Sequence, residues 1–217
     1  MDLSKLTIEE TISQCSKPTG DIGVEVGKKM NEHHKPLIKW GLGFLFNHIK
    51  EDSFNILDIG CGAGLAISLM AGAIPNSKIF GIDYSAEMVK SAINYNKDLV
   101  ESGNVIIQEG SVDKLPFEDN QFDIVTATET IYFWPDLLEN VKEVYRTLKN
   151  NGYFAVINED YNKSSNDKAH HKAMVDSDRI NLLEEIEHIE LFKNAGFKDI
   201  KVETIPSKGW IVVCGVK

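Results

Sequence analysis

Residues 56–64 read ILDIGCGAG, a short apolar run followed by three closely spaced glycines. A short apolar run that ends in glycines is typical of a buried strand in a parallel sheet. Glycines at positions 60, 62 and 64 would let the backbone approach a ligand closely, and a following helix would offer unpaired N–H groups. The stretch therefore predicts a strand, a ligand-binding turn and a helix.

The rest of the chain alternates between apolar runs and amphipathic segments. The expected strands are residues 54–60, 78–83, 104–110, 122–128, 153–159, 199–205 and 209–216. The expected helices are residues 22–34, 37–49, 65–73, 86–100, 135–148 and 182–195, with Pro36 separating the first two. Alternation of this kind predicts an α/β fold, a doubly wound Rossmann-like sheet with helices on both faces.

The chain is expected to form one domain overall. Residues 1–50 are predicted to form an N-terminal helical lid, and residues 51–217 the sheet domain. The polar stretch 160–181 is interpreted as an insertion on the acceptor side of the site.

Composition narrows the class of protein. The chain has 217 residues, 42% of them hydrophobic, and a formal net charge of −10. An acidic chain is a poor ligand for a phosphate backbone, so no nucleic-acid partner is expected. The start of the sequence has no cationic and apolar leader, and no apolar run is long enough to cross a membrane, so we expect a cytoplasmic protein. Three cysteines without a CxxC pair indicate free thiols in a reducing compartment.

The glycine turn favours a nucleoside-type ligand. Position 65 is Leu, so the nicotinamide pattern GxGxxG is not met, whereas GxGxG is. Asp58 places a carboxylate close to the turn, which suits a ligand that carries positive charge. Asp83 ends the second expected strand, where a carboxylate can accept hydrogen bonds from both ribose hydroxyls.

Four blocks carry a resemblance to a known family: ILDIGCGAG, FGIDYSAEMV, EGSVDKLPFEDNQFDIVTATETIYFWPD and VYRTLKNNGYFAVINE. Together they resemble the class I S-adenosylmethionine-dependent methyltransferases, and most of all the UbiE-like small-molecule branch. The resemblance implies S-adenosylmethionine as cofactor, S-adenosylhomocysteine as product, and a seven-stranded sheet of order 3-2-1-4-5-7-6 with strand 7 antiparallel.

The resemblance also implies which residues contact the cofactor. They are Asp58, Gly60, Cys61, Gly62, Asp83, Tyr84, Met88, Ser111, Val112, Thr128 and Glu129. One departs from the family pattern, because Ser111 stands where an Asp commonly accepts from the adenine amino group. A neutral hydroxyl is weaker there by about 1 kcal/mol, so a looser hold on adenine is expected.

The sequence gives fewer signals for the residues that would bind the methyl acceptor. His33 and His34 are candidate catalytic residues, because histidine is the natural proton acceptor near neutral pH. Tyr132, Trp134, Tyr161 and His170 are expected in the acceptor pocket, since the segment after the fourth strand is where this fold places its acceptor. The histidines show no HxH or HxxxH spacing, so no metal site is expected.

The sequence thus predicts an enzyme that moves a methyl group to a small-molecule nucleophile by in-line displacement. The alternative is a module that binds S-adenosylmethionine without catalysis, which the Ser111 departure keeps open. A nicotinamide-dependent oxidoreductase is disfavoured by Leu65. The acceptor atom (O, N, S or C) and the choice between monomer and homodimer stay open.

Overall fold

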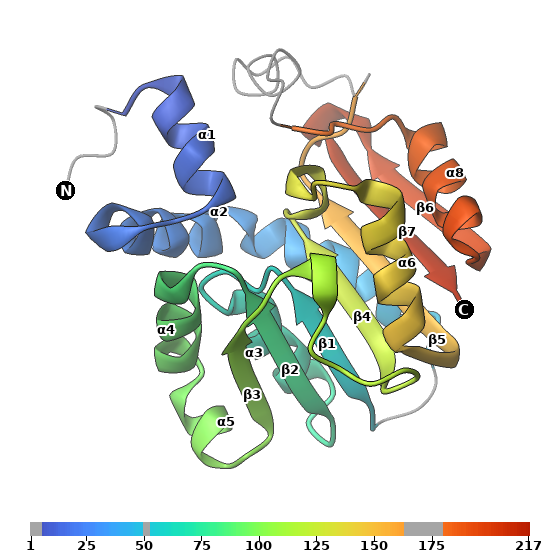
Figure 1. The fold of residues 1–217 in the computed structure, drawn as a ribbon, viewed down its shortest axis with the longest axis horizontal. Coiled ribbons are helices and arrows are strands. Elements are labelled where there is room, and N and C mark those ends of the chain that lie inside the picture. Colours follow the sequence, from blue (N-terminus) through green and yellow to red (C-terminus); the bar gives the residue numbers. More distant parts are fainter. Residues whose placement is uncertain (1–5, 50–52, 163–179) are drawn as a thin grey trace.

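The sheet and its helices are shown in Figure 1, a computed structural model that describes residues 6–49, 53–162 and 180–217. Within these residues, seven strands form one sheet of order β3-β2-β1-β4-β5-β7-β6. β7 pairs antiparallel with β5 and with β6, and the other pairings are parallel. The order and the single reversed strand confirm the predicted fold.

The strands are β1 (Asn55–Ile59), β2 (Lys78–Asp83), β3 (Val105–Glu109), β4 (Phe122–Thr128), β5 (Leu148–Asn158), β6 (Lys198–Ile205) and β7 (Trp210–Val216). The α-helices are α1 (Ile8–Ser16), α2 (Gly20–Phe46), α3 (Leu65–Ala73), α4 (Ala86–Tyr95), α5 (Lys97–Glu101), α6 (Leu137–Thr147) and α8 (Glu185–Ala195). The short 3₁₀ helices are η2 (Val112–Lys114), η3 (Ile131–Phe133) and η4 (Pro206–Lys208).

Two hydrophobic clusters cover the two faces of the sheet. Alternate residues of one strand point to opposite faces, so in β5 Phe154 joins the cluster that contains α6 and α8, while Ala155 joins the cluster that contains α2 and α3. Figure 1 shows α6 and α8 on the near face and α2 and α3 on the far face. Because both faces are covered, the strands read as continuous apolar runs.

α2 differs from the expectation of two helices separated at Pro36. It is one continuous helix, with Pro36 inside it. Pro36 lacks the N–H that would bond the carbonyl of Glu32, and both residues are exposed, so water can satisfy that carbonyl. Leu37, Ile38 and Gly41 are buried in the next turns, and their packing holds the helix through the proline.

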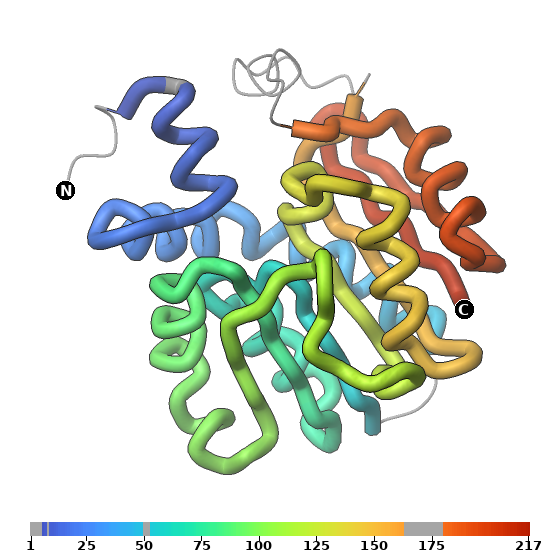
Figure 2. The backbone as a smooth tube through the Cα atoms, viewed as in Figure 1, coloured from blue at the N-terminus to red at the C-terminus, as the bar shows by residue number. Residues whose placement is uncertain are grey.

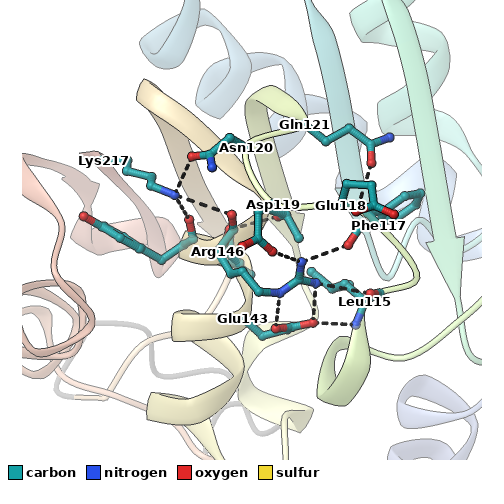
Figure 3. Close-up of polar contacts among 12 residues, drawn as sticks. Leu115, Phe117, Glu118, Asp119, Asn120, Gln121, Glu143, Arg146 and Lys217 are labelled. Carbon is teal, nitrogen blue, oxygen red and sulfur yellow. Dashed lines mark hydrogen bonds and ion pairs between the residues drawn. The ribbon is translucent and has the colours of Figure 1, made fainter.

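A guanidinium group secures the connection between β3 and β4 (Figure 3). Arg146 of α6 donates to the carbonyls of Leu115 and Phe117, and it forms ion pairs with Glu143 at 2.8 Å and Asp119 at 2.7 Å. These bonds fix the segment that leads into β4, whose far end reaches the candidate site described below.

No helix within the described residues is both long enough and apolar enough to cross a membrane.

We predict that Gly41→Ala destabilises the protein although alanine favours helices. A Cβ at Gly41 would lie 2.6 to 2.7 Å from three side-chain atoms of the buried, β-branched Ile157. Overpacking of this kind costs about 1–3 kcal/mol, which outweighs the helix-propensity gain of about 1 kcal/mol. Urea denaturation measures the change in the free energy of unfolding.

Gly43→Ala is the matched control, because a Cβ at Gly43 of the same helix meets nothing within 4 Å. It should stabilise the protein by about 0.5–1 kcal/mol. Equal effects of the two substitutions would contradict the close packing of α2 on β5.

Candidate functional site

Two adjoining cavities lie where the parallel strands end at their carboxyl termini. The glycine-loop cavity is lined by residues that include Asp58, Gly60, Gly62, Asp83 and Thr128. The α1–α2 cavity is larger, with a volume of about 530 Å³. Its lining includes Leu6, Ile12, Val26, Lys29, His33, Tyr132, Glu159, Asp160 and Ile180.

The two cavities share five lining residues: Cys15, Met30, His34, Glu129 and Phe133. A ligand in one cavity therefore lies beside a ligand in the other. This arrangement suits a reaction between two bound molecules.

The glycine loop bends sharply after β1. Gly60, Gly62 and Gly64 have φ values of 69°, 51° and 87°, a region that favours glycine. A Cβ at Gly60 would lie 2.4 Å from Oγ1 of Thr130, so only glycine fits there. At Gly62 a Cβ would meet nothing within 4 Å, which leaves the backbone open toward the cavity.

Asp83 holds this loop in place from the end of β2. Its Oδ2 accepts from the N–H of Gly62 at 2.9 Å, and its Oδ1 accepts from the N–H of Ser85 at 2.9 Å. Burial raises the pKa of Asp83, and these backbone hydrogen bonds oppose that shift. Each carboxylate oxygen keeps a further acceptor position, which suits two ligand hydroxyls.

Asp58 is a buried carboxylate on the wall of the same cavity. Thr126 donates to it through Oγ1 at 2.7 Å. Burial raises the pKa of Asp58 to about 7, and the charge of Asp83 adds to that rise. A ligand cation beside Asp58 would offset this burial, so the site favours a ligand with positive charge.

The groups around this cavity match the parts of S-adenosylmethionine. The carboxylates of Asp58 and Asp83 suit its ammonium group and ribose hydroxyls, respectively. Within the described residues, Oγ1 of Thr128 is buried without a hydrogen-bond partner, so it is free to bond a ligand here. Met88 is buried and adds an apolar wall.

The connection between α1 and α2 covers the glycine-loop cavity. The hydroxyl of Tyr84 donates to the carbonyl of Ser16, and the hydroxyl of Ser85 donates to the carbonyl of Pro18. The Lys17 ammonium lies 5.0 Å from the centre of the Tyr84 ring. In the tube view of Figure 2, α1 and the start of α2 lie beyond the end of the sheet where α4 begins.

Four polar side chains gather where the cavities meet, and we call them the His–Glu cluster: His33, His34, Glu129 and Glu159. Nε2 of His33 lies 2.9 Å from Oε2 of Glu159. Nε2 of His34 lies 3.4 Å from Oε2 of Glu129 and 3.5 Å from Oε2 of Glu159. α2 supplies the histidines, and the ends of β4 and β5 supply the carboxylates.

Glu129 is held in one orientation within this cluster. Its φ of 57° is uncommon for a residue with a side chain. Tyr132 donates to Oε2 of Glu129 at 2.7 Å, and the N–H of Glu159 donates to Oε1. Burial raises the pKa of Glu129, while the charge of His34 opposes that rise.

The charges of His34 and Glu129, which both line the two cavities, influence each other's pKa. Burial lowers the pKa of the His34 imidazole, but the charges of Glu129 and Glu159 raise it more, so the net shift is upward. His34 therefore carries a proton more readily than a free histidine, and that proton lies between two carboxylates.

The predicted cofactor residues are mostly brought together. Asp58, Gly60, Cys61, Gly62, Asp83, Tyr84, Met88, Thr128 and Glu129 all line the glycine-loop cavity. Burial raises the pKa of the Cys61 thiol well above its usual value, which fits a small packing residue and not a thiolate. Ser111 caps η2, and Val112 is buried in the sheet core. Neither is among the lining residues of this cavity.

The structure places only some of the predicted acceptor-side residues in the α1–α2 cavity. His33, His34 and Tyr132 line the α1–α2 cavity. Trp134 stacks on Phe154 in the core with ring centres 6.4 Å apart, and Phe133 lines both cavities instead. Tyr161 is buried beside a different, smaller cavity.

His170 lies outside the described residues, as does most of the predicted insertion 160–181.

Sequence reasoning missed Glu159, Asp160 and Met30. Glu159 and Asp160 directly follow β5, so the rule that ligands bind at the carboxyl ends of parallel strands would have found them. Met30 lies one turn before His34 in α2, and nothing in its spacing separates it from an ordinary core residue.

Comparison with known proteins agrees with this geometry. Residues 57–156 match the methyltransferase domain family. The chain is 35% identical over 103 residues to the uncharacterized methyltransferase YcgJ of Bacillus subtilis, which covers 47% of this chain and 39% of that protein. It is 36% identical over 104 residues to a demethylmenaquinone methyltransferase of Listeria welshimeri, covering 48% of this chain and 44% of the relative. The matches thus span less than half of each relative.

Solved structures share the fold over most of the chain. An S-adenosylmethionine-dependent methyltransferase from Aquifex aeolicus superposes with a TM-score of 0.73 at 20% identity, covering 89% of this chain and 97% of that one. A phosphoethanolamine N-methyltransferase from Haemonchus contortus, in complex with S-adenosylmethionine, gives a TM-score of 0.70 at 19% identity, covering 82% of this chain and 52% of that one. The family match over residues 57–156 and the shared fold together support a class I S-adenosylmethionine-dependent methyltransferase.

Proposed function

We propose that the protein transfers a methyl group from S-adenosylmethionine to a small molecule bound in the α1–α2 cavity. The observation that carries this proposal is the meeting of the two cavities at His34, Glu129 and Phe133. One cavity has the carboxylates that suit the cofactor. The other offers space for an acceptor beside it.

The chain's own residues divide the work of binding the cofactor. Asp83 would accept from the ribose hydroxyls and keep the glycine loop in its bent form. Asp58 would balance the ammonium group, and Thr128 would use its unpaired hydroxyl on the methionine side. Bound S-adenosylmethionine supplies a sulfonium methyl group, which an acceptor lone pair takes while the C–S bond electrons pass to sulfur.

The walls of the α1–α2 cavity suggest the character of the acceptor. Leu6, Ile12, Val26, Met30 and Ile180 contribute apolar side chains, and the His–Glu cluster forms the polar side. An acceptor with an apolar body and one polar nucleophile would fit. Closure by α1 and α2 would exclude water, which favours transfer to the acceptor over loss to solvent.

We propose that the His–Glu cluster orients and activates the acceptor nucleophile. His34 is the candidate catalytic residue nearest the cofactor, since it lines both cavities. His33 lines only the α1–α2 cavity, and 64% of its side chain is exposed. His33 therefore contacts the acceptor side alone.

We propose that the protein acts in the cytoplasm. Cys15, Cys61 and Cys214 are all free, which is compatible with action in a reducing, cytoplasmic compartment.

The deciding experiment uses S-adenosylmethionine with a deuterated methyl group. The protein is incubated with a deproteinised metabolite extract, and mass spectrometry searches for labelled products. We expect a labelled small molecule with the native protein and none with Asp83→Asn, which weakens the hydrogen bonds to ribose and loop. Calorimetric binding of S-adenosylhomocysteine without any labelled product would instead favour a sensor without catalysis.

We predict that His34→Gln separates transfer from cofactor binding. Loss of a group that activates the acceptor typically lowers turnover about 100-fold or more. The dissociation constant for S-adenosylhomocysteine should change far less, because the carboxylates that suit it remain. His48→Gln is the matched control, since His48 ends the same helical region and lines neither cavity. Equal turnover of the native protein and His34→Gln would refute the role of His34.

We predict that cofactor affinity rises with pH because Asp58 must be ionised to attract the ligand ammonium. Its pKa of about 7 in the free protein leaves much of it protonated below neutrality. S-adenosylhomocysteine should therefore bind more tightly as the pH rises from about 6 to about 8, by up to about tenfold. Isothermal calorimetry measures the change, and Asp58→Asn should flatten the profile. A profile as steep in Asp58→Asn would assign the effect to another group.

A further inference from the structure

We propose that His33, His34 and Glu159 bind a divalent first-row transition-metal ion on the wall of the α1–α2 cavity. One nitrogen from each histidine and one oxygen of Glu159 all lie within 4.8 Å of one another. The existence of this site does not depend on the proposed function; its role in activating the acceptor does.

The spacing of the ligand atoms carries the argument. Metal–nitrogen and metal–oxygen bonds of about 2.0–2.2 Å place neighbouring ligands about 2.9 to 3.4 Å apart, from octahedral to tetrahedral geometry. Oε2 of Glu159 is 2.9 Å from Nε2 of His33 and 3.5 Å from Nε2 of His34. Both imidazoles thus converge on the same carboxylate oxygen, with separations close to those that ligands of one ion adopt.

Glu129 lies beside this set of three residues without being part of it. Oε2 of Glu129 lies 3.4 Å from Nε2 of His34. The hydrogen bonds from Tyr132 and from the backbone of Glu159 fix this carboxylate, as outer partners do in metal sites. Asp160, also buried on this cavity wall, adds a third negative charge nearby.

The donor set indicates the kind of ion. Two imidazoles with one carboxylate suit Zn²⁺, Fe²⁺, Co²⁺ or Ni²⁺, whereas Mg²⁺ and Ca²⁺ prefer oxygen ligands alone. Glu159 is 126 residues from His33 in sequence, so the spacing rules that led to the expectation of no metal site could not detect this set.

The ion would face the space proposed for the acceptor. All four members of the His–Glu cluster line the α1–α2 cavity, so an ion held there would be accessible from this cavity. An acceptor hydroxyl bound there would release its proton to water more readily, because a metal ion lowers the pKa of a coordinated oxygen. The resulting oxygen would then keep its lone pair for the methyl group.

The test titrates the whole, chelator-treated protein with Co²⁺ and follows the visible absorption of the ion. We expect saturation at one ion per chain, with intense bands of a four- or five-coordinate site that Zn²⁺ abolishes and Mg²⁺ does not. Calorimetry with Zn²⁺ gives the affinity. His33→Ala and Glu159→Gln should each weaken Zn²⁺ binding at least about 100-fold, more than loss of an outer partner does.

Glu32→Gln is the matched control, because Glu32 is an exposed carboxylate next to His33 that lies outside the cluster. It should bind Zn²⁺ like the native protein. His33→Ala is expected to fold normally, because an exposed histidine contributes little to stability. Loss of Zn²⁺ binding in this variant therefore reports on the ligand itself, and circular dichroism checks that the fold is retained.

Several outcomes would overturn the proposal. Absence of saturable Co²⁺ absorption, or equal Zn²⁺ affinity in His33→Ala and the native protein, would leave only hydrogen-bonded ion pairs. Binding of S-adenosylhomocysteine, measured separately with chelator present, reports on the proposed function alone. Unchanged methyl transfer in the chelator would reject the catalytic role of the ion and support the methyltransferase itself.

Discussion

The Asp83 carboxylate is the constraint on which the site depends. It accepts from the backbone of Gly62 and of Ser85, and so ties the glycine loop after β1 to the start of α4 after β2. Without this link, glycines with positive φ would leave the loop free to adopt many conformations, since glycine loses more entropy on ordering than any other residue. The same carboxylate is thus a structural clamp and a ligand acceptor. Its burial, which raises its pKa, is the cost of combining the two roles.

Parallel strands explain why so many polar groups can meet in one place. β1, β2, β4 and β5 all end at the same edge, and Asp58, Asp83, Thr128 and Glu159 lie at or next to these ends. Each group is held by a rigid strand end, so its position varies little. Helices α1 and α2 complete the site from outside the sheet, through contacts such as those of Tyr84 with Ser16 and Ser85 with Pro18.

Local sequence signals predicted the parts of the site that a short segment determines. The glycine turn, Asp58 and Asp83 follow from residue type and position at strand ends, and the structure places all of them on one cavity. The interpretation of Pro36 as a break was wrong, because tertiary packing of Leu37, Ile38 and Gly41 outweighed the lost hydrogen bond. The aromatic segment 132–134 lies in the connection between β4 and α6, and the path of this connection determines which rings face the core and which face the cavities. Sequence alone did not show that Trp134 would stack on Phe154 while Phe133 faces the cavities.

The His–Glu cluster depends on contacts between distant segments. This is why Glu159 and the gathering of the four side chains escaped prediction, although His33, His34 and Glu129 were each predicted as site residues. From the sequence alone, a histidine on α2 could also be interpreted as a solvent-exposed residue. Only the fold shows that Glu129 and Glu159 lie against it. Once buried together, one imidazole between two carboxylates is not a simple proton acceptor, because their charges favour its protonated form. A single base would work better with a lower pKa and fewer acidic neighbours. A group of two histidines and two carboxylates is better suited to surrounding a cation, whether a proton shared within the cluster or a metal ion. The proposed metal ion rests on the spacing of the ligand atoms of His33, His34 and Glu159.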